Sequence, residues 1–243
     1  TYTVLNNSTI AAQISAGNYN LCTSFVTDMN SLFKNKGSFN SNISFWDTSN
    51  VSNMSSMFHN AYAFNQNIGN WNTSNVTTML EMFHGASSFN QNIGNWNVTK
   101  VQNMRSMFSN ATAFNSNIGT WTISSTTNMS YMFAGASDFN QNINTNNGKW
   151  NMSSVTTIEG MFHNASYFNQ YLNDWDTSNV TSMKQMFLGA ESFNQNIDKW
   201  NVSNVISMIC MFDRAESFNQ NISSWNVSNV EYKRDIFKEA NSM

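Results

Sequence analysis

The chain has 243 residues, of which 10% are charged and 40% are hydrophobic, and its net charge at pH 7 is −3. Because soluble domains have roughly 25% charged residues, this chain is unusually uncharged. Its 11 lysines and arginines are too few for a protein that binds nucleic acid by neutralising phosphates. No apolar run approaches the length of about 18 residues that a membrane-spanning helix requires, so we expect no membrane insertion.

Residues 1–25 do not follow the pattern of the rest of the chain, and we expect them to form an N-terminal cap or an interlocking element. Tyr2–Leu5 is predicted to be a strand, and Asn7–Ala16 a short helix that ends before Gly17. The chain starts at Thr1 instead of methionine, which favours a mature chain that has lost a signal peptide, or an excised fragment.

Residues 26–229 are built from a repeat that is marked by tryptophan. Successive tryptophans are 25 residues apart, except for one interval of 29 that reflects a four-residue insertion around 144–147. One unit, Val51–Asn75, reads VSNMSSMFHNAYAFNQNIGNWNTSN. A period of this length is typical of a leucine-rich-repeat-like solenoid, in which each repeat supplies one strand and one helix. A single unit buries too little apolar area to fold alone, so neighbouring units must stack.

Each unit is predicted to begin with a helix, because apolar residues recur at helical spacing between Val51 and Ala61. An asparagine that can cap the free N–H groups precedes this helix, at Asn50, Asn75, Asn179, Asn204 and Asn229. The helix is expected to end at a residue that tolerates the left-handed conformation, namely Asn60, Gly85, Asn110, Gly135, Asn164 and Gly189.

The second half of each unit is predicted to be a strand, Phe64–Ile68, followed by a turn, Gly69–Asn75. The predicted fold is therefore an α/β solenoid of about eight 25-residue strand–helix repeats with a parallel β-ladder. The recurring Asn-Gln-Asn segment lies in the strand, where stacked amides can form side-chain ladders beside the backbone ladder. The predicted asparagine ladder consists of Asn65, Asn67, Asn90, Asn92, Asn140, Asn142, Asn194, Asn196, Asn219 and Asn221.

The repeat also resembles that of a known family. The shared pattern is Asn-Val-Thr-x-Met-x-x-Met-Phe-x-x-Ala, as in Asn75–Ala86, followed by Phe-Asn-Gln-Asn-Ile-x-x-Trp-Asn-Val-Ser, as in Phe193–Ser203. In this pattern, over about residues 26–240, the chain resembles the BspA-like leucine-rich repeat family, which includes the repeat of unknown function common in mycoplasma-type surface lipoproteins. The resemblance implies a secreted or surface-attached solenoid that serves in adhesion or binding and has no catalytic site.

Residues 230–243 hold six charged residues and allow two interpretations. They are either a capping helix that keeps the solenoid soluble, or a half-unit that interlocks with another copy. Ala240 corresponds to Ala61 and Met243 to Phe64, so the chain stops where a strand should begin. The N-terminal strand of a second copy could continue it, and such a head-to-tail contact builds a filament. The predicted assembly interface consists of Tyr2, Val4, Ala240 and Met243.

Nothing in the sequence indicates an enzyme, a metal site or a cofactor. The histidines His59, His84 and His163 share one position of the repeat without the converging donors that a metal needs, so we expect them to be structural. Cys22 and Cys210 lie too far apart for a disulfide within a regular solenoid, and we expect free thiols, with a bond between copies as the alternative. No glycine-rich phosphate loop and no Ser/His/Asp set is present.

Sixteen Asn-x-Ser/Thr sequons are compatible both with chance and with extracellular glycosylation. The sequons that follow tryptophan alternate with Asp47 and Asp176, which indicates a turn position instead of a glycan site. Nothing structural is expected to fix Asn53 and Asn128, and Asn110 and Asn164 are expected at an exposed helix terminus. We therefore predict glycans at these four residues.

Two functions follow from the sequence. The first is a non-enzymatic extracellular structural protein whose copies assemble end to end into a glycosylated fibre. The alternative is a monomeric surface adhesin that uses the Asn-rich strand face, with Tyr62, Tyr167 and Tyr171, to hold a glycan or a host or cell-surface protein. Both hypotheses place the chain outside the cell or at the cell surface, without nucleic acid or cofactor.

Overall fold

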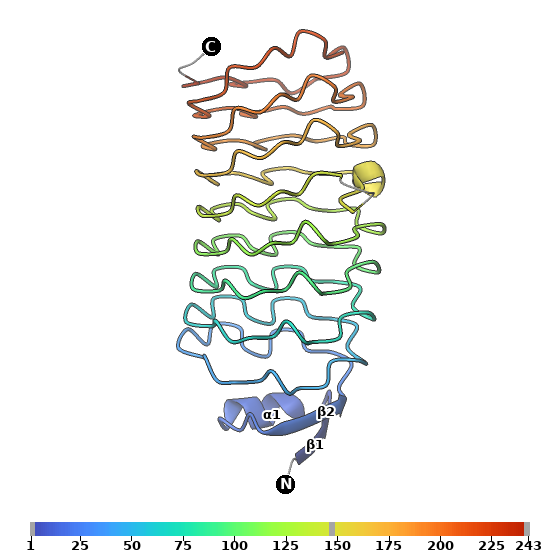
Figure 1. Cartoon of the computed structure of the whole chain (residues 1–243), viewed down its shortest axis with the longest axis vertical. Helices are drawn as coiled ribbons and strands as arrows, with labels where there is room; N and C mark the ends of the chain where they lie inside the picture. Colours follow the sequence, from blue (N-terminus) through green and yellow to red (C-terminus); the bar gives the residue numbers. More distant parts are fainter. Residues whose placement is uncertain (1–2, 146–148, 241–243) are drawn as a thin grey trace.

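The structure is a computed structural model that describes residues 3–145 and 149–240. The chain winds into successive turns that lie one on top of another along the long axis (Figure 1). We call each such turn, of 25 residues in the regular repeat, a coil. The regular elements are β1 (Thr3–Asn6), α1 (Ile10–Ser15), β2 (Leu21–Phe25) and the 3-10 helix η2 (Met152–Ser154). All other described residues lie outside helices and strands.

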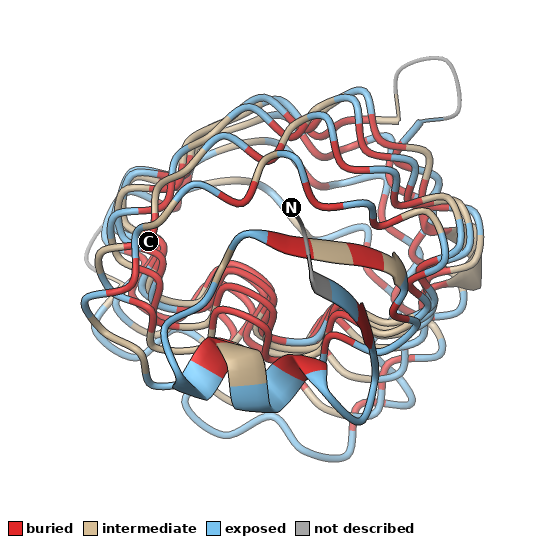
Figure 2. Ribbon diagram, turned by 90° about the horizontal axis from the view of Figure 1, so that it is seen from below, coloured by how far each residue is buried: buried red, intermediate tan, exposed pale blue. Residues whose placement is uncertain are grey.

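The N-terminal elements close one end of the stack. β1 runs parallel to β2, with Val4 paired to Cys22. α1 lies across the end of the stack, and its residues Ile10 and Ile14 are buried in the core (Figures 1 and 2). A strand and a helix thus form where they were predicted, although α1 is shorter than the predicted Asn7–Ala16 and Tyr2 lies outside the described residues. The second strand, β2, was not predicted. Gly17 follows α1 with a φ of 78°, the left-handed conformation that commonly ends a helix.

One segment of each coil, equivalent to Asn53–Asn60, bonds directly to the next coil, and we call it the ladder segment. Within it, backbone N–H groups alternate between two kinds of acceptor. One set donates to carbonyls of the next coil at 2.7–3.1 Å: Met54 to Thr78, Ser56 to Leu80, Phe58 to Met82 and Asn60 to His84. The N–H groups between them donate within their own coil, as from Met57 to Met54. The coils are therefore joined by an unbroken series of backbone bonds.

The helix predicted for Val51–Ala61 is wrong. The ladder segment has a positive φ at Ser56 (53°) and at Asn60 (56°), which an α-helix does not contain. Each of these residues is the third residue of a tight turn, where a positive φ is characteristic of a type II turn. A succession of such turns returns apolar side chains to one side at nearly the spacing of a helix. The hydrophobic pattern therefore fits both structures.

The residues predicted to mark the helix ends have other roles. Those expected to be left-handed do have positive φ, but inside the ladder segment: Asn60, Gly85, Asn110, Gly135, Asn164 and Gly189. The predicted N-cap residues bridge two coils, because there is no helix for them to cap. Asn50 Nδ2 donates to the carbonyl of Ser24 at 2.8 Å. The same bond to the preceding coil is made by Asn75, Asn179, Asn204 and Asn229.

The strand predicted for Phe64–Ile68 is also wrong. Phe64 N–H donates to the Ala61 carbonyl in a turn, and no strand forms in this segment. Both Phe64 and Ile68 are fully buried, so the expected inward direction of their side chains is correct. Parallel pairing between coils occurs instead in the ladder segment, as a row of isolated bridges from Asp28 to Tyr232.

The core consists of columns of like side chains that run along the stack. Phe58 stacks on Phe83 of the next coil with 5.4 Å between ring centroids, and on Phe64 of its own coil at 3.9 Å. Each tryptophan side chain donates its indole N–H to a carbonyl of the preceding coil, as from Trp96 to Ile68 at 3.1 Å. Burial of one such side chain stabilises the fold by about 1.5–3 kcal/mol. The columns therefore hold the coils in register.

The insertion around 144–147 leaves this register unchanged. Trp150, which follows it, is fully buried and donates to the carbonyl of Ile118 at 3.0 Å, as the other tryptophans do. The short helix η2 comes next, and Asn151 caps it by accepting a hydrogen bond from the N–H of Ser153.

The C-terminal residues continue the stack. Tyr232 is bridged to Ser207, and Phe237 stacks on Phe212 with 5.5 Å between ring centroids. No helix forms in residues 230–240, so the predicted capping helix is wrong for the described part of this segment.

The close contact between coils at Gly135 provides a test of the ladder geometry. Its φ is 69°, and a Cβ added there would meet Asn110 Oδ1 of the preceding coil. We expect Gly135→Ala to lower the free energy of unfolding by about 2 kcal/mol in a urea titration, because backbone conformation and contact both oppose the methyl group. In an Asn110→Gly background the cost should fall to about 1 kcal/mol, since only the backbone effect remains. An equal loss of free energy of unfolding in both backgrounds would show that Asn110 does not contact the added methyl group.

Candidate binding face

A row of exposed and half-buried amide side chains follows one side of the stack, and we call it the asparagine face. It is formed in each coil by the residues equivalent to Asn65–Asn70. Asn65 Oδ1 accepts two hydrogen bonds from the next coil, from Asn90 N–H at 3.0 Å and from Gln91 Nε2 at 2.9 Å. The same pair of bonds is accepted by Asn40, Asn115, Asn140, Asn169 and Asn194. The first asparagine of each segment therefore forms a side-chain ladder.

The predicted ladder differs from this arrangement at half of its members. The second asparagine of each segment bonds inside its own coil, as Asn67 Oδ1 accepts from Gly69 N–H at 3.0 Å. The same local turn is made by Asn92, Asn142, Asn196 and Asn221. Conversely, sequence reasoning missed the ladder residues Asn40, Asn115 and Asn169, because the residues after them interrupt the Asn-Gln-Asn pattern.

The glutamine between the two asparagines completes the ladder, and its absence at Ser116 opens a hollow. Asn90 Oδ1 accepts from Asn115 N–H at 2.9 Å, but Ser116 supplies no Nε2 group as a second donor. Over this position lies an open depression of about 550 Å³. Its lining includes Asn90, Asn95, Asn115, Ser116, Thr120 and Gln141. The hollow is thus lined by amides, hydroxyls and backbone.

A second depression of about 480 Å³ adjoins the first, because both are lined by Asn90 and Asn115. It is also lined by Asp138 and by Tyr167, whose side chain is among the most exposed large ones, at 63%. Asp138 is exposed as well. Together the two depressions place an aromatic ring, a carboxylate and several amides around the same pair of asparagines.

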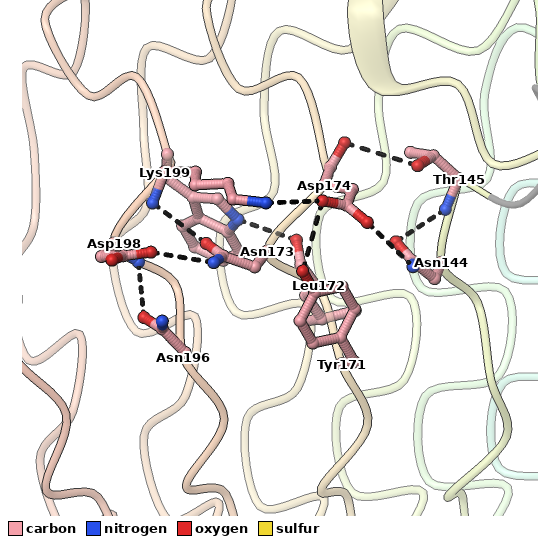
Figure 3. A network of polar contacts seen from close by, with 10 residues as sticks. Asn144, Thr145, Tyr171, Leu172, Asn173, Asp174, Asn196, Asp198 and Lys199 are labelled. Atoms are coloured by element: carbon pink, nitrogen blue, oxygen red, sulfur yellow. Dashed lines mark hydrogen bonds and ion pairs between the residues drawn. The ribbon is translucent and has the colours of Figure 1, made fainter.

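Further along the face, charged residues replace asparagine and glycine and form the network of Figure 3. Asp174 is its centre: it accepts from Lys199 Nζ at 3.2 Å, from Tyr171 OH at 3.2 Å and from Asn144 Nδ2 at 3.4 Å. Asn173 Nδ2 donates to Asp198 at 2.8 Å. The network joins Asn144, at the start of the insertion, to two following coils.

Hydrogen bonds set the protonation of this network. Those from Asn144 and Lys199 hold the pKa of the Asp174 carboxyl below its ordinary value, and the one from Asn173 does the same for Asp198. The hydrogen bond to Asp174 raises the pKa of Lys199. At neutral pH the face therefore presents two carboxylates and one ammonium group at these positions.

The histidines and Tyr131 lie on the ladder segments, away from the asparagine face. His59 stacks on His84 with 4.5 Å between ring centroids, and His59 Nδ1 lies 3.2 Å from Glu81 Oε2. Tyr131 OH donates to Glu159 at 3.0 Å. Burial and then this hydrogen bond raise the pKa of Tyr131 to about 12. Each of these polar contacts joins neighbouring coils.

The four predicted glycan sites fall into two classes. Asn53 and Asn128 are half-buried in the ladder segment, and their Oδ1 atoms accept from Ser55 N–H and Ser130 N–H. The expectation that nothing structural fixes them is therefore wrong: their position requires a short acceptor for a local turn. Asn110 and Asn164 are exposed, as predicted, although they belong to turns and not to a helix terminus.

The two predicted assembly residues that the structure describes, Val4 in β1 and Ala240 in the last coil, lie at opposite ends of the stack (Figure 1). Val4 in β1 is 61% exposed, whereas Ala240 is half-buried and donates its N–H to the Phe237 carbonyl. Tyr2 and Met243 lie outside the described residues. The structure therefore shows the surroundings of two of the four residues, and end-to-end contact stays a prediction.

Catalytic and metal-binding arrangements were searched among residues 3–145 and 149–240. No group of three or more His, Cys, Asp and Glu side chains that could hold a metal occurs there. Cys22 and Cys210 are free thiols. Within the described part of the chain, no helix has the length and apolar character needed to cross a membrane.

Comparison with known proteins gives one family and a distant structural likeness. The family described as "Mycoplasma protein of unknown function, DUF285" matches residues 3–111, 64–149, 92–170 and 143–243. Among solved structures, the "Crystal structure of TLR13-ssRNA13 complex" is similar with a TM-score of 0.35 and 11% identity. That alignment covers 98% of this chain and 48% of the other, so the chain spans about half the length of that protein. No curated protein sequence matches.

Removal of one ladder asparagine tests the role of the amides. We expect Asn65→Ala to lower the free energy of unfolding by about 1 kcal/mol, because Asn90 N–H and Gln91 Nε2 lose their acceptor. Urea unfolding of the single and double variants measures the effect. Gln91→Ala should add almost no cost in the Asn65→Ala background, since their shared bond is already absent. Additive costs would show that the two side chains act independently.

The half-buried histidines His84 and His163 predict a loss of stability in acid. Burial lowers the pKa of His84, as do the charges of His59 and Lys34, and burial also lowers the pKa of His163. Their pKa is thus higher in the unfolded chain, which takes up protons more readily below the ordinary value of 6.5. The free energy of unfolding should be constant above that pH and fall below it.

The measurement is urea unfolding between pH 7.5 and about 5, compared with the double variant His84→Ala/His163→Ala. Alanine is accommodated at this position of the repeat, as Ala134 shows. The double variant should lose less stability than the wild type over this range. An identical pH dependence of the two proteins would exclude these histidines as its source.

Proposed function

This chain belongs to the DUF285 family, and from that premise we propose that it is a non-enzymatic binding module that works outside the cell or at its surface. The asparagine face is its contact surface, and the stacked aromatic core serves as a rigid support. The finer assignment to the BspA-like leucine-rich repeat solenoids belongs to this proposal as well. It is supported by the 25-residue period and by the stacking of coils.

The observation that carries the proposal is the interruption of an otherwise regular asparagine face. Ser116 replaces a ladder glutamine and leaves a hollow, and Tyr171 takes the place of a turn asparagine. Asp174 and Lys199 stand at the position of Asn70, where they form the network of Figure 3. A face that only joined coils would need the same residue in each coil, whereas a contact surface requires groups that differ along it.

The fibre is a second candidate, and the last coil favours it. Its N–H groups at Lys233, Asp235, Phe237 and Glu239 are equivalent to those that bond forward in every other coil, and they have no backbone acceptor among the described residues. An open edge of this kind is a template for pairing with another chain. At the other end, however, α1 covers the first coil, which favours the binding module (Figure 2).

Glycosylation of the module is proposed for Asn110 and Asn164 in preference to Asn53 and Asn128. The first two are exposed, whereas the second two are half-buried and engaged in turns. Mass spectrometry of the glycopeptides of the chain from its native source shows which asparagines carry glycans. A glycan at Asn53 would contradict this order.

The proposed contact surface is tested by binding of the fluorescently labelled chain to a panel of bacterial and eukaryotic cells, read by flow cytometry. Asn70→Glu/Asn95→Glu adds two carboxylates to the asparagine face at a position that already holds Asp174. We expect this variant to lose most cell binding, because the added charges disturb the contact. Unfolding by urea should show unchanged stability within about 0.5 kcal/mol.

The matched control places the same two charges elsewhere on the coil. Gln102 and Ile206 are exposed at a position that holds Glu231 in the last coil, so Gln102→Glu/Ile206→Glu should fold and bind like the wild type. Negative-stain electron microscopy at micromolar concentration should show dispersed short rods. Uniform fibres, or equal cell binding by both variants, would overturn the proposal in favour of the structural candidate.

A further inference from the structure

We propose that the hollow over Asn90 and Asn115 is a binding site for an uncharged saccharide, namely a pyranose ring with free hydroxyl groups. This inference rests on the proposed function, because it names the class of ligand that the asparagine face holds. It is carried by the step of the amide ladder that is incomplete, the only such step among the described residues, and by the side chains that surround it.

The first argument is an acceptor that lacks its usual donor. In six other steps of the ladder the asparagine Oδ1 accepts both a backbone N–H and a glutamine Nε2. At Asn90 the second donor is missing, because Ser116 stands where the glutamine would be. An amide oxygen has two lone pairs, so Asn90 Oδ1 can accept one more bond, and Asn90 lines the hollow. A ligand that fits there must donate a hydrogen bond.

The second argument is that the hollow also offers donors. Asn92 and Asn117 bond within their coils only through Oδ1, which accepts from Gly94 N–H and Gly119 N–H. Both residues line the hollow, and each Nδ2 group lacks a bond to the described protein. A hydroxyl group both donates and accepts, so neighbouring hydroxyls of a sugar match an edge of alternating amide oxygens and N–H groups.

The third argument is the aromatic ring beside the hollow. Tyr167 is exposed and lines the adjoining depression together with Asp138. A pyranose ring has an apolar face of C–H groups, which packs on the electron-rich face of an aromatic ring. The Asp138 carboxylate is an acceptor for two hydroxyl groups. The ring of Tyr167 offers a sugar an apolar contact, and the carboxylate of Asp138 beside it offers a polar one.

The charges of the site select an uncharged ligand. The lining of the first depression contains no charged side chain among the described residues, and that of the second contains only Asp138. A sulfated or carboxylated sugar would therefore meet a carboxylate without a compensating cation. A peptide would in turn lack apolar pockets for its side chains, since the first depression is lined by polar residues and glycine.

The test restores the missing ladder residue. Ser116→Gln supplies the Nε2 donor to Asn90 and fills the hollow, so it should remove saccharide binding while stability stays equal or rises. Binding is measured on an array of neutral oligosaccharides and, for the best of these, by isothermal titration calorimetry. We expect the affinity to fall at least about tenfold in this variant. Tyr167→Ala should weaken binding to a similar extent. Alanine is tolerated at this position of the repeat, because Ala63 and Ala113 already occupy it in other coils.

The matched control is Ser41→Gln. Ser41 holds the same position in the first coil, where α1 stands in place of a preceding ladder, so the same substitution is made away from the hollow. It should bind saccharide like the wild type. Equal affinity of Ser116→Gln and Ser41→Gln would overturn the site.

The outcomes separate this inference from the proposed function. A wild-type chain that binds cells but no neutral saccharide would overturn the inference and leave the proposed function in place, with a protein as the partner. Saccharide binding without cell binding would support the site and contradict a role at cell surfaces. Loss of both in Ser116→Gln, with Ser41→Gln unaffected, is the expected result.

Discussion

The fold depends on the alternation of backbone hydrogen bonds in the ladder segment. Half of the N–H groups bond forward to the next coil and the others bond back within their own coil. This arrangement requires two left-handed residues in each coil, which for non-glycine residues costs on the order of 1 kcal/mol each. One coil alone could not offset that cost. Stacking does, because it satisfies the backbone and aligns the aromatic columns at the same time.

The same constraint explains how far the sequence predicted the fold. The tryptophan interval established the period, and the strand and helix near the N-terminus were recognised from ordinary signals. The structure of the ladder segment was not recognised, because its turns bury Met54, Met57 and Phe58 at a spacing that also fits a helix. One of its two left-handed positions is moreover held by residues that give no turn signal, such as Glu81 and Tyr131.

The sequence predicted the kind of side chain that forms the candidate site, but it did not predict where on the face the site lies. The repeated Asn-Gln-Asn segment indicated stacked amides, and Tyr167 was associated with a binding face. One signal in the sequence could have located the hollow: the serine in Asn115-Ser116-Asn117 breaks the glutamine pattern. Local turns of the second asparagine could not be separated from ladder bonds by residue type, because an amide oxygen serves equally in both. Only the three-dimensional structure distinguishes an asparagine that accepts from the next coil from one that accepts within its own coil.

Core and surface have different tolerance for change in this architecture. The phenylalanine columns need the same ring in each coil, because each ring packs on its equivalents in the neighbouring coils. The tryptophans from Trp150 to Trp225 stack on one another in the same way. On the asparagine face Ser116 is half-buried and Asp174 and Lys199 are exposed, so these residues can replace the usual one without affecting the columns. The molecule thus combines a repetitive interior with local chemistry on its surface.

The forward bonds also give the stack a direction. In the ladder segment, every internal coil presents N–H groups to the coil after it and carbonyls to the coil before it. A whole coil could therefore be duplicated or deleted between two others without a change in any backbone partner type. The distance along the rod between two surface features, such as the hollow at Ser116 and the network at Asp174, would change only in increments of one coil. Gain or loss of whole repeats during evolution would then change the distance between two contact sites on the surface. Each contact site would itself stay intact.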